Sequence, residues 1–478
     1  METDQLNRKA KLGVIWNTAE RIVTQGVQFV LTIVLARLLS PEIFGIVAMP
    51  TIFLALSQVF IDSGFANAII RKPDIKEEDL STAFYFNIIV GLICYFILFF
   101  LSPAIALFFH TPILENVLKI TALVTLFNPL CIVQQAILTK KLNFKTQAYI
   151  AVASSVVSGV LGIWMAYNNY GIWSLVVQQV SASLIRLILL WFLGGWVPRK
   201  GWSRASFSYL WNYGSKVVVV GILDTFYNNI YAFVIGKFYN AKDLGNYSRS
   251  QTIADLPVGN LGSILQRVTL PLFSEIQQDE SRLESAYLRL LKMTALMMFP
   301  LMLGISALSR PFILIVLGEK WEGCIFILQI LCIARVWTPL NAVNINLLQV
   351  KGRTDLFLKV EIAKKTVLTA ILAITLFQSL KIMMIGFAVA TSFAFLLNTY
   401  FTQKVGVPML KQIRAILPIM IISIIMMFII ILIDMLIVNI YMQMIVGILV
   451  GTLSFYLMCT LAKIDAINDL KRVLLGKN

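Results

Sequence analysis

The stretch LARLLSPEIFG, from Leu35 to Gly45, decides the fold because its pattern returns as IGKFYNAKDLG, from Ile235 to Gly245. Both copies run through apolar, small and basic residues, then two large apolar residues and a short polar turn that ends in glycine. Two shorter matches follow in the same order, NPL at Asn128 with TPL at Thr338, and GIWSLV at Gly171 with GFAVAT at Gly386. Their spacing drifts from 200 to 215 residues, as short loop insertions produce. The matches indicate an internal duplication.

The repeats lie in a chain that is far more apolar than a soluble protein. Of its 478 residues, 59% are hydrophobic and 13% are charged, against about 25% charged in soluble domains. A helix needs about 20 apolar residues to cross the hydrocarbon. The sequence therefore predicts an all-α membrane protein, in which Pro257 and Gly259 interrupt the eighth span. Fourteen spans are predicted to begin near Leu12, Ile43, Ser81, Ile113, Ala148, Gly171, Tyr213, Leu244, Tyr287, Gly323, Leu356, Ile382, Ala415 and Tyr441.

The basic residues are arranged for membrane orientation and not for nucleic-acid binding. The formal charge is +16, but lysines and arginines form short clusters between apolar stretches. The termini and the even-numbered loops hold 26 of the 40 basic residues, and the opposite loops hold six. Because positive charge is retained in the cytoplasm, both termini are predicted to be cytoplasmic. We expect membrane lipids as partners and no nucleic acid.

The duplication divides the chain into two lobes and a final helix pair. We expect residues 1–195 to form the first six spans, 196–212 a cytoplasmic interfacial linker, 213–405 spans seven to twelve, and 406–478 the last pair with a tail. Since six is even, the lobes have the same orientation and are predicted to be related by a pseudo-two-fold axis along the membrane normal. Two lobes with a cleft between them favour an alternating-access carrier.

The first span carries a polar face that hydrocarbon penalises. It reads IWNTAERIVTQGVQFVLTIVLARLL over residues 15–39. At 100° per residue its polar side chains fall within an arc of about 140°, and a charge at the bilayer centre costs about 2.5–3.5 kcal/mol. A solvated translocation cavity explains the whole face; a structural Glu–Arg pair that fixes helix packing is the alternative. The residues assigned to the cavity are Asn17, Glu20, Arg21, Gln25 and Gln28.

Lobe two repeats the polar face with different residues. Asp224 and Asn228 share one side of the seventh span, at 200 residues from Thr24 and Gln28. In the eighth span, Arg249, Asn260 and Arg267 share one face if the helix is continuous, and Arg335 lies mid-span in the tenth. Arginines suit an anionic ligand because guanidinium binds phosphate oxygens bidentately. Glu20, Asp224 and Asp255 are candidates for ion coupling; Lys119, Arg186 and Asp434 lie near enough to span ends to reach the interface.

The cysteines do not indicate a metal or cofactor. All five lie in apolar stretches without metal-ligand spacing, so they are interpreted as small core residues. No cofactor is expected.

Several longer stretches carry a resemblance to a known family. They are LARLLSPEIFGIVAM, DSGFANAIIRKPDIKEEDLSTAFYFN, KLNFKTQA, YGIWSLVVQQ, VIGKFYNAKDLGNYSRS and LPLFSEIQQDESRLESAYLRLLK. Together they resemble the polysaccharide-transporter (Wzx-like) flippases of the multidrug/oligosaccharidyl-lipid/polysaccharide exporter superfamily, of the colanic-acid-exporter type. The resemblance implies an inner-membrane carrier that moves an undecaprenyl-diphosphate-linked glycan repeat unit to the periplasmic leaflet. It also implies that Arg21, Arg249 and Arg267 lie on cavity-lining helices.

Other functions remain as alternatives. A drug/cation antiporter of the same superfamily, or a flippase for the peptidoglycan lipid precursor, shares the expected architecture. A membrane glycosyltransferase or glycan polymerase needs a large external loop, and the outward loops around residues 103–112 and 310–322 are too short. We therefore expect a transporter and not an enzyme, with a lipid-linked oligosaccharide substrate and glycan polymerase machinery as a partner.

Overall fold

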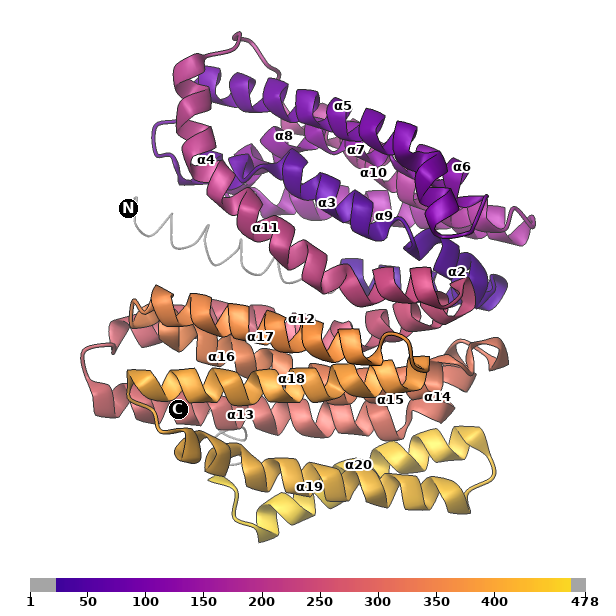
Figure 1. Ribbon diagram of the computed structural model, residues 1–478, viewed down its shortest axis with the longest axis vertical. Helices are drawn as coiled ribbons and strands as arrows, with labels where there is room; N and C mark the ends of the chain where they lie inside the picture. The colour runs from indigo at the N-terminus through magenta and orange to yellow at the C-terminus, as the bar shows by residue number, and fades with distance from the viewer. Residues whose placement is uncertain (1–22, 466–478) are drawn as a thin grey trace. The chain divides into compact units, whose positions relative to one another are not determined.

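The computed structural model describes residues 23–465, apart from the side chains of residues 264 and 266–268, and this range is helical without a strand (Figure 1). Its contacts divide the chain into two compact units, Met1–Gly245 and Asn246–Asn478. The predicted boundaries at residues 195, 212 and 405 stay a prediction.

The first unit contains the first seven of the predicted spans. Its second and fourth spans are each broken into three helices, and the others are single helices. The elements are the helix Val23–Leu38, α2 (Pro41–Ala48), α3 (Thr51–Asp62), α4 (Phe65–Arg71), α5 (Glu77–Phe108), α6 (Leu114–Thr121), α7 (Val124–Phe127), α8 (Pro129–Lys140), α9 (Phe144–Tyr167), α10 (Ile172–Gly194) and α11 (Arg204–Phe238).

The second unit contains the remaining spans. The long helix α12 begins in the first unit and continues in the second. The elements are α12 (Ala241–Glu275), α13 (Glu280–Ala307), α14 (Ser309–Val316), η1 (Glu319–Trp321), α15 (Cys324–Arg335), α16 (Trp337–Val350), α17 (Thr354–Thr375), α18 (Leu380–Thr402), η2 (Gln403–Val405), α19 (Met409–Leu436) and α20 (Ile440–Leu461).

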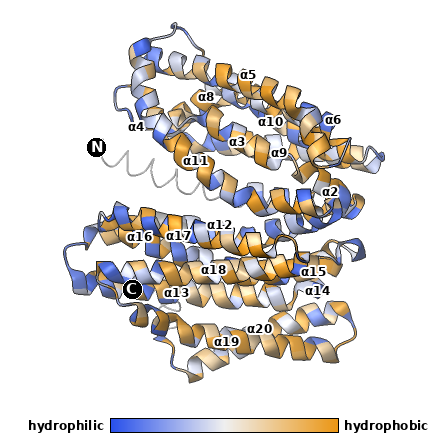
Figure 2. Ribbon diagram, in the orientation of Figure 1, coloured by the Kyte–Doolittle hydropathy of each residue, from blue (hydrophilic) through white to orange (hydrophobic). Residues whose placement is uncertain are grey.

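The helices have the length and composition of membrane spans. In the described range, eleven segments are long and apolar enough to cross a bilayer. The helices α12 and α17 have the length but carry charged side chains within it, and Val23–Leu38 is a shorter apolar helix. Figure 2 shows hydrophilic residues gathered towards the helix ends and apolar residues along the middles. The chain is a multi-pass membrane protein, and the predicted all-α class is confirmed, with eleven of the fourteen predicted spans meeting these criteria within the described residues.

Residues next to the helix starts satisfy the first free backbone N–H groups. At α5, the backbone N–H of Lys76 donates to Asp79 Oδ2 over 2.9 Å. At α13, the N–H of Arg282 donates to Asp279 Oδ1 over 3.0 Å. Such caps are worth about 1 kcal/mol each.

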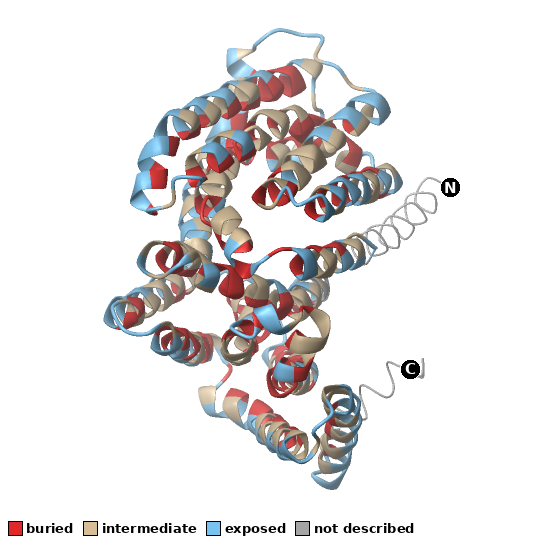
Figure 3. Ribbon diagram, turned by 90° about the vertical axis from the view of Figure 1, so that its right-hand side faces the viewer, coloured by how far each residue is buried: buried red, intermediate tan, exposed pale blue. Residues whose placement is uncertain are grey.

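Small residues let helices approach closely within the first unit. A Cβ added at Gly45 would overlap the carbonyl oxygen of Ala241, and one added at Gly245 would overlap that of Pro41. The two contacts are equivalent because Pro41 and Ala241, like Gly45 and Gly245, are 200 residues apart. The segments 41–45 and 241–245 therefore cross with local two-fold symmetry. Figure 3 shows the buried residues on the helix faces turned towards neighbouring helices.

One predicted helix interruption and one repeat match differ from the structure. The predicted interruption at Pro257 and Gly259 is wrong, because α12 runs unbroken through both residues. A proline removes one backbone hydrogen bond, and the intact turns on either side hold the helix together. The third repeat match is also imperfect: Gly171 precedes α10, whereas Gly386 lies inside α18.

Candidate substrate-binding site

The polar face of the first helix is only partly visible. Asn17, Glu20 and Arg21 lie outside the described residues, so their assignment to a cavity stays a prediction. In the helix Val23–Leu38, Gln25 is half-buried and Gln28 is exposed. In α11, both Asp224 and Asn228 are exposed, as residues of a wet lining need to be.

The second unit joins a candidate cavity residue to a candidate coupling residue. Arg335 Nε lies 2.9 Å from Asp255 Oδ1, with side-chain exposures of 21% and 41%. Arg335 ends α15, and its guanidinium also lies 5.7 Å from the ring centroid of Phe387 in α18. Asp255 thus reaches Arg335 from the unbroken helix α12.

Hydrogen bonds between α12 and α15 position the arginines. Ser250 Oγ donates to the carbonyl oxygen of Cys324 over 3.1 Å, and Cys324 Sγ lies 3.4 Å from the carbonyl oxygen of Asn246. Arg249 lies between these two contacts on α12 and is half-buried. The first turn of α15 is therefore fixed against the part of α12 that carries Arg249.

The continuous α12 aligns three of the predicted residues. Arg249, Asn260 and Arg267 are 11 and 7 residues apart, which at 100° per residue returns them to one side of the helix. Asn260 is half-buried, while the side chain of Arg267 lies outside the described residues. At a rise of about 1.5 Å per residue the series extends about 27 Å along the helix.

This arrangement can bind an anionic headgroup. Arg335 is already paired with Asp255, so its charge is partly neutralised, and a phosphate can compete with the carboxylate for the guanidinium group. Guanidinium offers a planar set of donors that matches phosphate oxygens. In the part of the chain that the structure describes, no group of three or more His, Cys, Asp or Glu side chains has the arrangement of a metal site.

Sequence reasoning missed a buried polar network in the second unit. The Tyr287 hydroxyl contacts the side-chain oxygens of Asn344 and Gln412, the latter over 2.8 Å. Gln412 Nε2 donates to the carbonyl oxygen of Val407 over 2.8 Å. These contacts fix α19 to α13 and α16. Single polar residues in apolar runs gave no signal of their pairing, because the partners are 57 and 125 residues apart.

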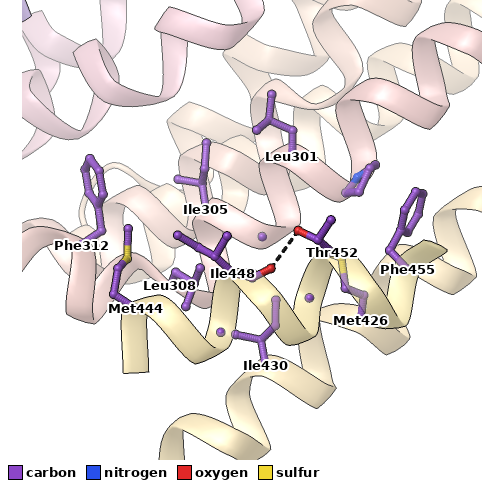
Figure 4. A pocket seen from close by; sticks show the side chains of 14 residues that line it. Leu301, Ile305, Leu308, Phe312, Met426, Ile430, Met444, Ile448, Thr452 and Phe455 are labelled. Atoms are coloured by element: carbon purple, nitrogen blue, oxygen red, sulfur yellow. Dashed lines mark hydrogen bonds between the residues drawn. The ribbon is translucent and has the colours of Figure 1, made fainter. Parts of the chain in front are cut away.

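An apolar pocket lies between the last helix pair and the rest of the second unit. It has a volume of about 470 Å³ and is formed by α13, α14, α19 and α20. Leu301, Ile305, Met426 and Ile448 are among the residues that line it (Figure 4), and the only hydrogen bond drawn is that of Thr452 to its own helix. The pocket suits a hydrocarbon chain and offers nothing to a sugar or phosphate.

The first unit holds a hydrogen-bonded chain that the sequence did not predict. Asn128 donates to Gln58, and Gln58 donates to Asp62. Arg186 acts electrostatically on Asp62, and the expectation that its side chain reaches the interface stays a prediction. Discontinuous helices were not predicted for the second span, although the sequence DSG, over residues 62–64, was a signal for one.

Two curated proteins are similar to this chain over most of its length. The chain is 31% identical over 303 residues to the teichuronic acid biosynthesis protein TuaB of Bacillus subtilis (strain 168), covering 63% of this chain and 62% of that protein. It is 27% identical over 365 residues to the lipopolysaccharide biosynthesis protein WzxC of Escherichia coli (strain K12), covering 75% and 73%. The match thus spans less than two thirds of the length of TuaB.

Solved structures show the fold. Lipid II flippase MurJ in an inward closed conformation matches with a TM-score of 0.76 at 17% identity, over 95% of this chain and 100% of that one. An inward-facing multidrug resistance MATE family transporter of the MOP superfamily matches with a TM-score of 0.60 at 16% identity, over 80% and 95%. The model of the family described as "Polysaccharide biosynthesis protein" matches residues 34–326, more than half of the chain. The chain therefore belongs to this polysaccharide biosynthesis protein family.

Proposed function

We propose that the chain is an alternating-access flippase for a lipid-linked oligosaccharide. It moves an undecaprenyl-diphosphate-linked repeat unit across the bacterial inner membrane for polysaccharide or lipopolysaccharide biosynthesis. The observation that carries the proposal is the coincidence of two matches: the family model over residues 34–326, and the fold of a lipid II flippase over 95% of the chain. Family membership supports the glycan pathway, and the fold supports a carrier.

The arginines of the second unit support an anionic substrate. Arg249 and Arg335 lie on α12 and α15, two helices that hydrogen bonds hold together. A diphosphate needs donors at membrane depth, where a lone charge is costly and a paired one is tolerated. Arg21 and Arg267 join this site in the proposal, with Asn17, Gln25, Gln28, Asn228 and Asn260 contacting sugar hydroxyls.

The same proposal covers chemistry, location and partners. The protein carries out transport without making or breaking a covalent bond, and so is not an enzyme. Both termini are cytoplasmic, as the basic loops predict. The glycan polymerase machinery consumes the flipped product on the opposite side. Glu20, Asp224 and Asp255 are the proposed ion-coupling residues.

Deletion of the gene tests the proposal directly. We expect a lipid-linked oligosaccharide to accumulate on the cytoplasmic leaflet, identified by mass spectrometry of extracted lipids and by its resistance to periplasmic labelling. Complementation with the wild-type gene should clear it. Normal export without any accumulated lipid would contradict the proposal.

A residue-level arm tests the arginine site. Charge reversal of both Arg249 and Arg267 should weaken binding of the lipid diphosphate to the purified protein by tenfold or more, since each charge-assisted hydrogen bond is worth about 1.5–3 kcal/mol. Arg21→Ala should abolish flipping and leave membrane insertion intact. Reversal of Lys463 in the C-terminal tail is the matched control. Unchanged affinity in the α12 variant would exclude these arginines from the site.

The two alternatives have distinct outcomes. A drug/cation antiporter confers drug efflux from cells, and the matched MATE fold covers 80% of the chain. A peptidoglycan precursor flippase rescues growth when the native precursor flippase is depleted. Either result, with no effect on surface polysaccharide, would replace the proposed substrate.

A further inference from the structure

The segment that connects α10 to α11, residues 195–203, is fixed against α5 by hydrogen bonds although it is not helical. The backbone N–H of Lys200 donates to Ser81 Oγ over 3.3 Å. The backbone N–H of Ser203 donates to Thr82 Oγ1 over 3.0 Å. The connecting segment therefore has a defined backbone, and the side chains on it are presented from a firm base.

These hydrogen bonds also give the depth of the connecting segment in the membrane. Directly after Thr82, α5 continues from Ala83 to Leu101 without a charged side chain. At a rise of about 1.5 Å per residue this stretch is about 28 Å long, close to the thickness of the hydrocarbon. Ser81 and Thr82 thus lie at the boundary between hydrocarbon and headgroups, on the side that the basic loops predict to be cytoplasmic. The segment bonded to them lies at headgroup level.

Three basic side chains are exposed on or directly after this segment, Arg199, Lys200 and Arg204. Lys200 Nζ lies 3.9 Å from Glu78 Oε1, with side-chain exposures of 59% and 48%, so this ion pair is loose and wet. In the part of the chain that the structure describes, Arg199 and Arg204 have no acidic partner. The surface therefore keeps a net positive charge at the level of the lipid headgroups.

The other acidic side chains at the start of α5 are already engaged. Trp196 Nε1 donates to Glu77 Oε1 over 3.0 Å. Asp79 is buried and lies 2.7 Å from Lys72 Nζ. Neither carboxylate is therefore available to neutralise the two arginines.

An exposed indole lies among the three basic residues. Trp202 is 48% exposed, and its ring centroid lies 5.0 Å from that of Phe207. Phe207 in turn stacks on Trp211 with a centroid distance of 5.8 Å. One part of the Trp202 ring is thus packed and the rest is open, as in the aromatic residues that anchor proteins at the membrane interface.

We propose that Arg199, Lys200, Trp202 and Arg204 form a binding site for an anionic phospholipid of the cytoplasmic leaflet. The basic groups bind the phosphate oxygens of the headgroup, and the indole packs against the glycerol and the first methylene groups. An anionic lipid fits because it neutralises the unpaired arginines, whereas a zwitterionic lipid brings a cation of its own. Binding of a phospholipid at this site does not depend on which substrate the protein transports.

A lipid titration of the purified full-length protein tests the proposal. Native mass spectrometry compares phosphatidylglycerol with phosphatidylethanolamine of the same acyl chains, and we expect phosphatidylglycerol to bind more tightly. Each basic residue at headgroup level raises affinity for an anionic lipid about fivefold. Replacing all three by glutamine should therefore weaken phosphatidylglycerol binding by tenfold or more.

A second triple variant separates the site from the overall charge. It removes three exposed basic residues from the second unit, Arg282, Lys359 and Lys404. Its affinity should stay within about twofold of the native protein, because its net charge changes equally but the site is intact. Unchanged affinity in the site variant, or an equal loss in the control, would overturn the site.

Hydrogen exchange in lipid nanodiscs tests the location. Residues 196–206 should exchange more slowly in nanodiscs that contain phosphatidylglycerol than in nanodiscs of phosphatidylcholine, and the site variant should lose this difference. Equal exchange of the native protein in both membranes would overturn an anionic lipid as the occupant and would leave the surface to a protein partner.

The indole has its own matched pair of variants. Trp202→Ala should weaken phosphatidylglycerol binding several-fold. Trp164→Ala removes an indole that is 59% exposed near the other end of the membrane, in the last turn of α9, and should have no effect. Equal affinities of the two variants would exclude Trp202 from the site.

Salt decides the question if the triple site variant does not fold. A ligand that binds the native state raises the temperature of unfolding, so the stabilisation of the native protein by phosphatidylglycerol measures binding. This stabilisation should fall as potassium chloride is raised from about 0.05 M to about 0.5 M, because salt screens exposed charges. Stabilisation that is independent of salt would overturn a site made by charged groups.

Discussion

The second and eighth spans begin alike and continue differently. Segments 41–45 and 241–245 cross with local symmetry through Gly45 and Gly245. Span 2 is interrupted between α2 and α3 and again at Ser63 and Gly64, while α12 is one helix of 35 residues that includes the shared start. The duplication has kept the crossing, where backbone shape is decisive, and has let the polar residues along the two helices diverge.

The physical reason for the difference is local. Two consecutive left-handed residues redirect the chain, and no intrahelical hydrogen bond can bridge them. A proline inside a helix costs only its own N–H bond and some strain. The broken span carries a carboxylate at its break, and the unbroken span carries Arg249 and Asp255. The two repeats therefore carry different charged residues along their equivalent helices.

A substitution where segments 41–45 and 241–245 cross should cause the largest loss of stability. Gly245→Ala places a methyl group where the carbonyl oxygen of Pro41 lies. Because the obstacle is backbone, the helices must separate, and we expect a loss of about 3 kcal/mol or more, the upper range for overpacking. Thermal unfolding of the detergent-solubilised protein measures the loss.

The matched control for this variant lies in the same helix. A Cβ at Gly262 meets nothing within 4 Å, so Gly262→Ala should leave stability unchanged or raise it by about 0.5–1 kcal/mol. Equal stability of the two variants would show that α12 does not cross α2 as described. Gly45→Ala should reproduce the effect of Gly245→Ala, because the contacts are equivalent.

Removing one partner of the Asp255–Arg335 ion pair, which joins α12 to α15, should cause the next largest loss of stability. Arg335→Met leaves Asp255 without its partner, and Asp255→Asn leaves Arg335. Since both side chains are partly exposed, we expect about 1–2 kcal/mol for each, between the values for surface and buried pairs. A double-mutant cycle measures the coupling. A coupling energy near zero would mean that the two groups do not interact in the membrane.

The parts of the fold that the sequence predicts are those set by short-range patterns. Apolar runs of membrane length predict the all-α class and the order of the helices, whereas the division into two lobes at residues 195–212 stays a prediction. Breaks were harder to predict. Pro257 suggested an interruption that does not occur, because a helix can lose one backbone hydrogen bond and continue. The break at Ser63 and Gly64 lies inside an apolar run and was missed. A helix cannot continue through these two residues because both are left-handed.

The sequence predicted which helices carry the site residues, but not which side chains pair with one another. Arg335 and Asp255 were both singled out for being charged at membrane depth, but their pairing depends on the packing of α12 against α15. The chain from Asn128 to Asp62 and the network of Tyr287 join residues that are polar yet uncharged, and such residues are common in apolar helices. Only the tertiary structure distinguishes a paired amide from an isolated one.

The break itself can be tested against the unbroken helix. Gly64→Ala forces a side chain into a left-handed conformation, and its Cβ lies 3.0 Å from Val217 Cβ. We expect a loss of about 1–2 kcal/mol. Pro257→Ala restores an N–H to a continuous helix and should not lower stability. Thermal unfolding compares the two, and a stable Gly64→Ala protein would show that span 2 can pass through residue 64 as a regular helix.

The start of the ninth span should show the smallest effect, as a change with pH. The backbone N–H of Arg282 and the hydroxyl of Ser281 donate to Asp279, and these bonds hold its pKa below the ordinary 3.8. The cap therefore stabilises the first turn of α13 above that pH, and its contribution is lost as the pH falls through the lowered value. Asn caps a helix without titrating, so Asp279→Asn should remove this acid-dependent fraying. Hydrogen exchange of residues 280–284, compared between the two proteins at about pH 6 and about pH 3, measures the difference, and fraying of equal extent in both would show that the Asp279 carboxylate does not cap α13.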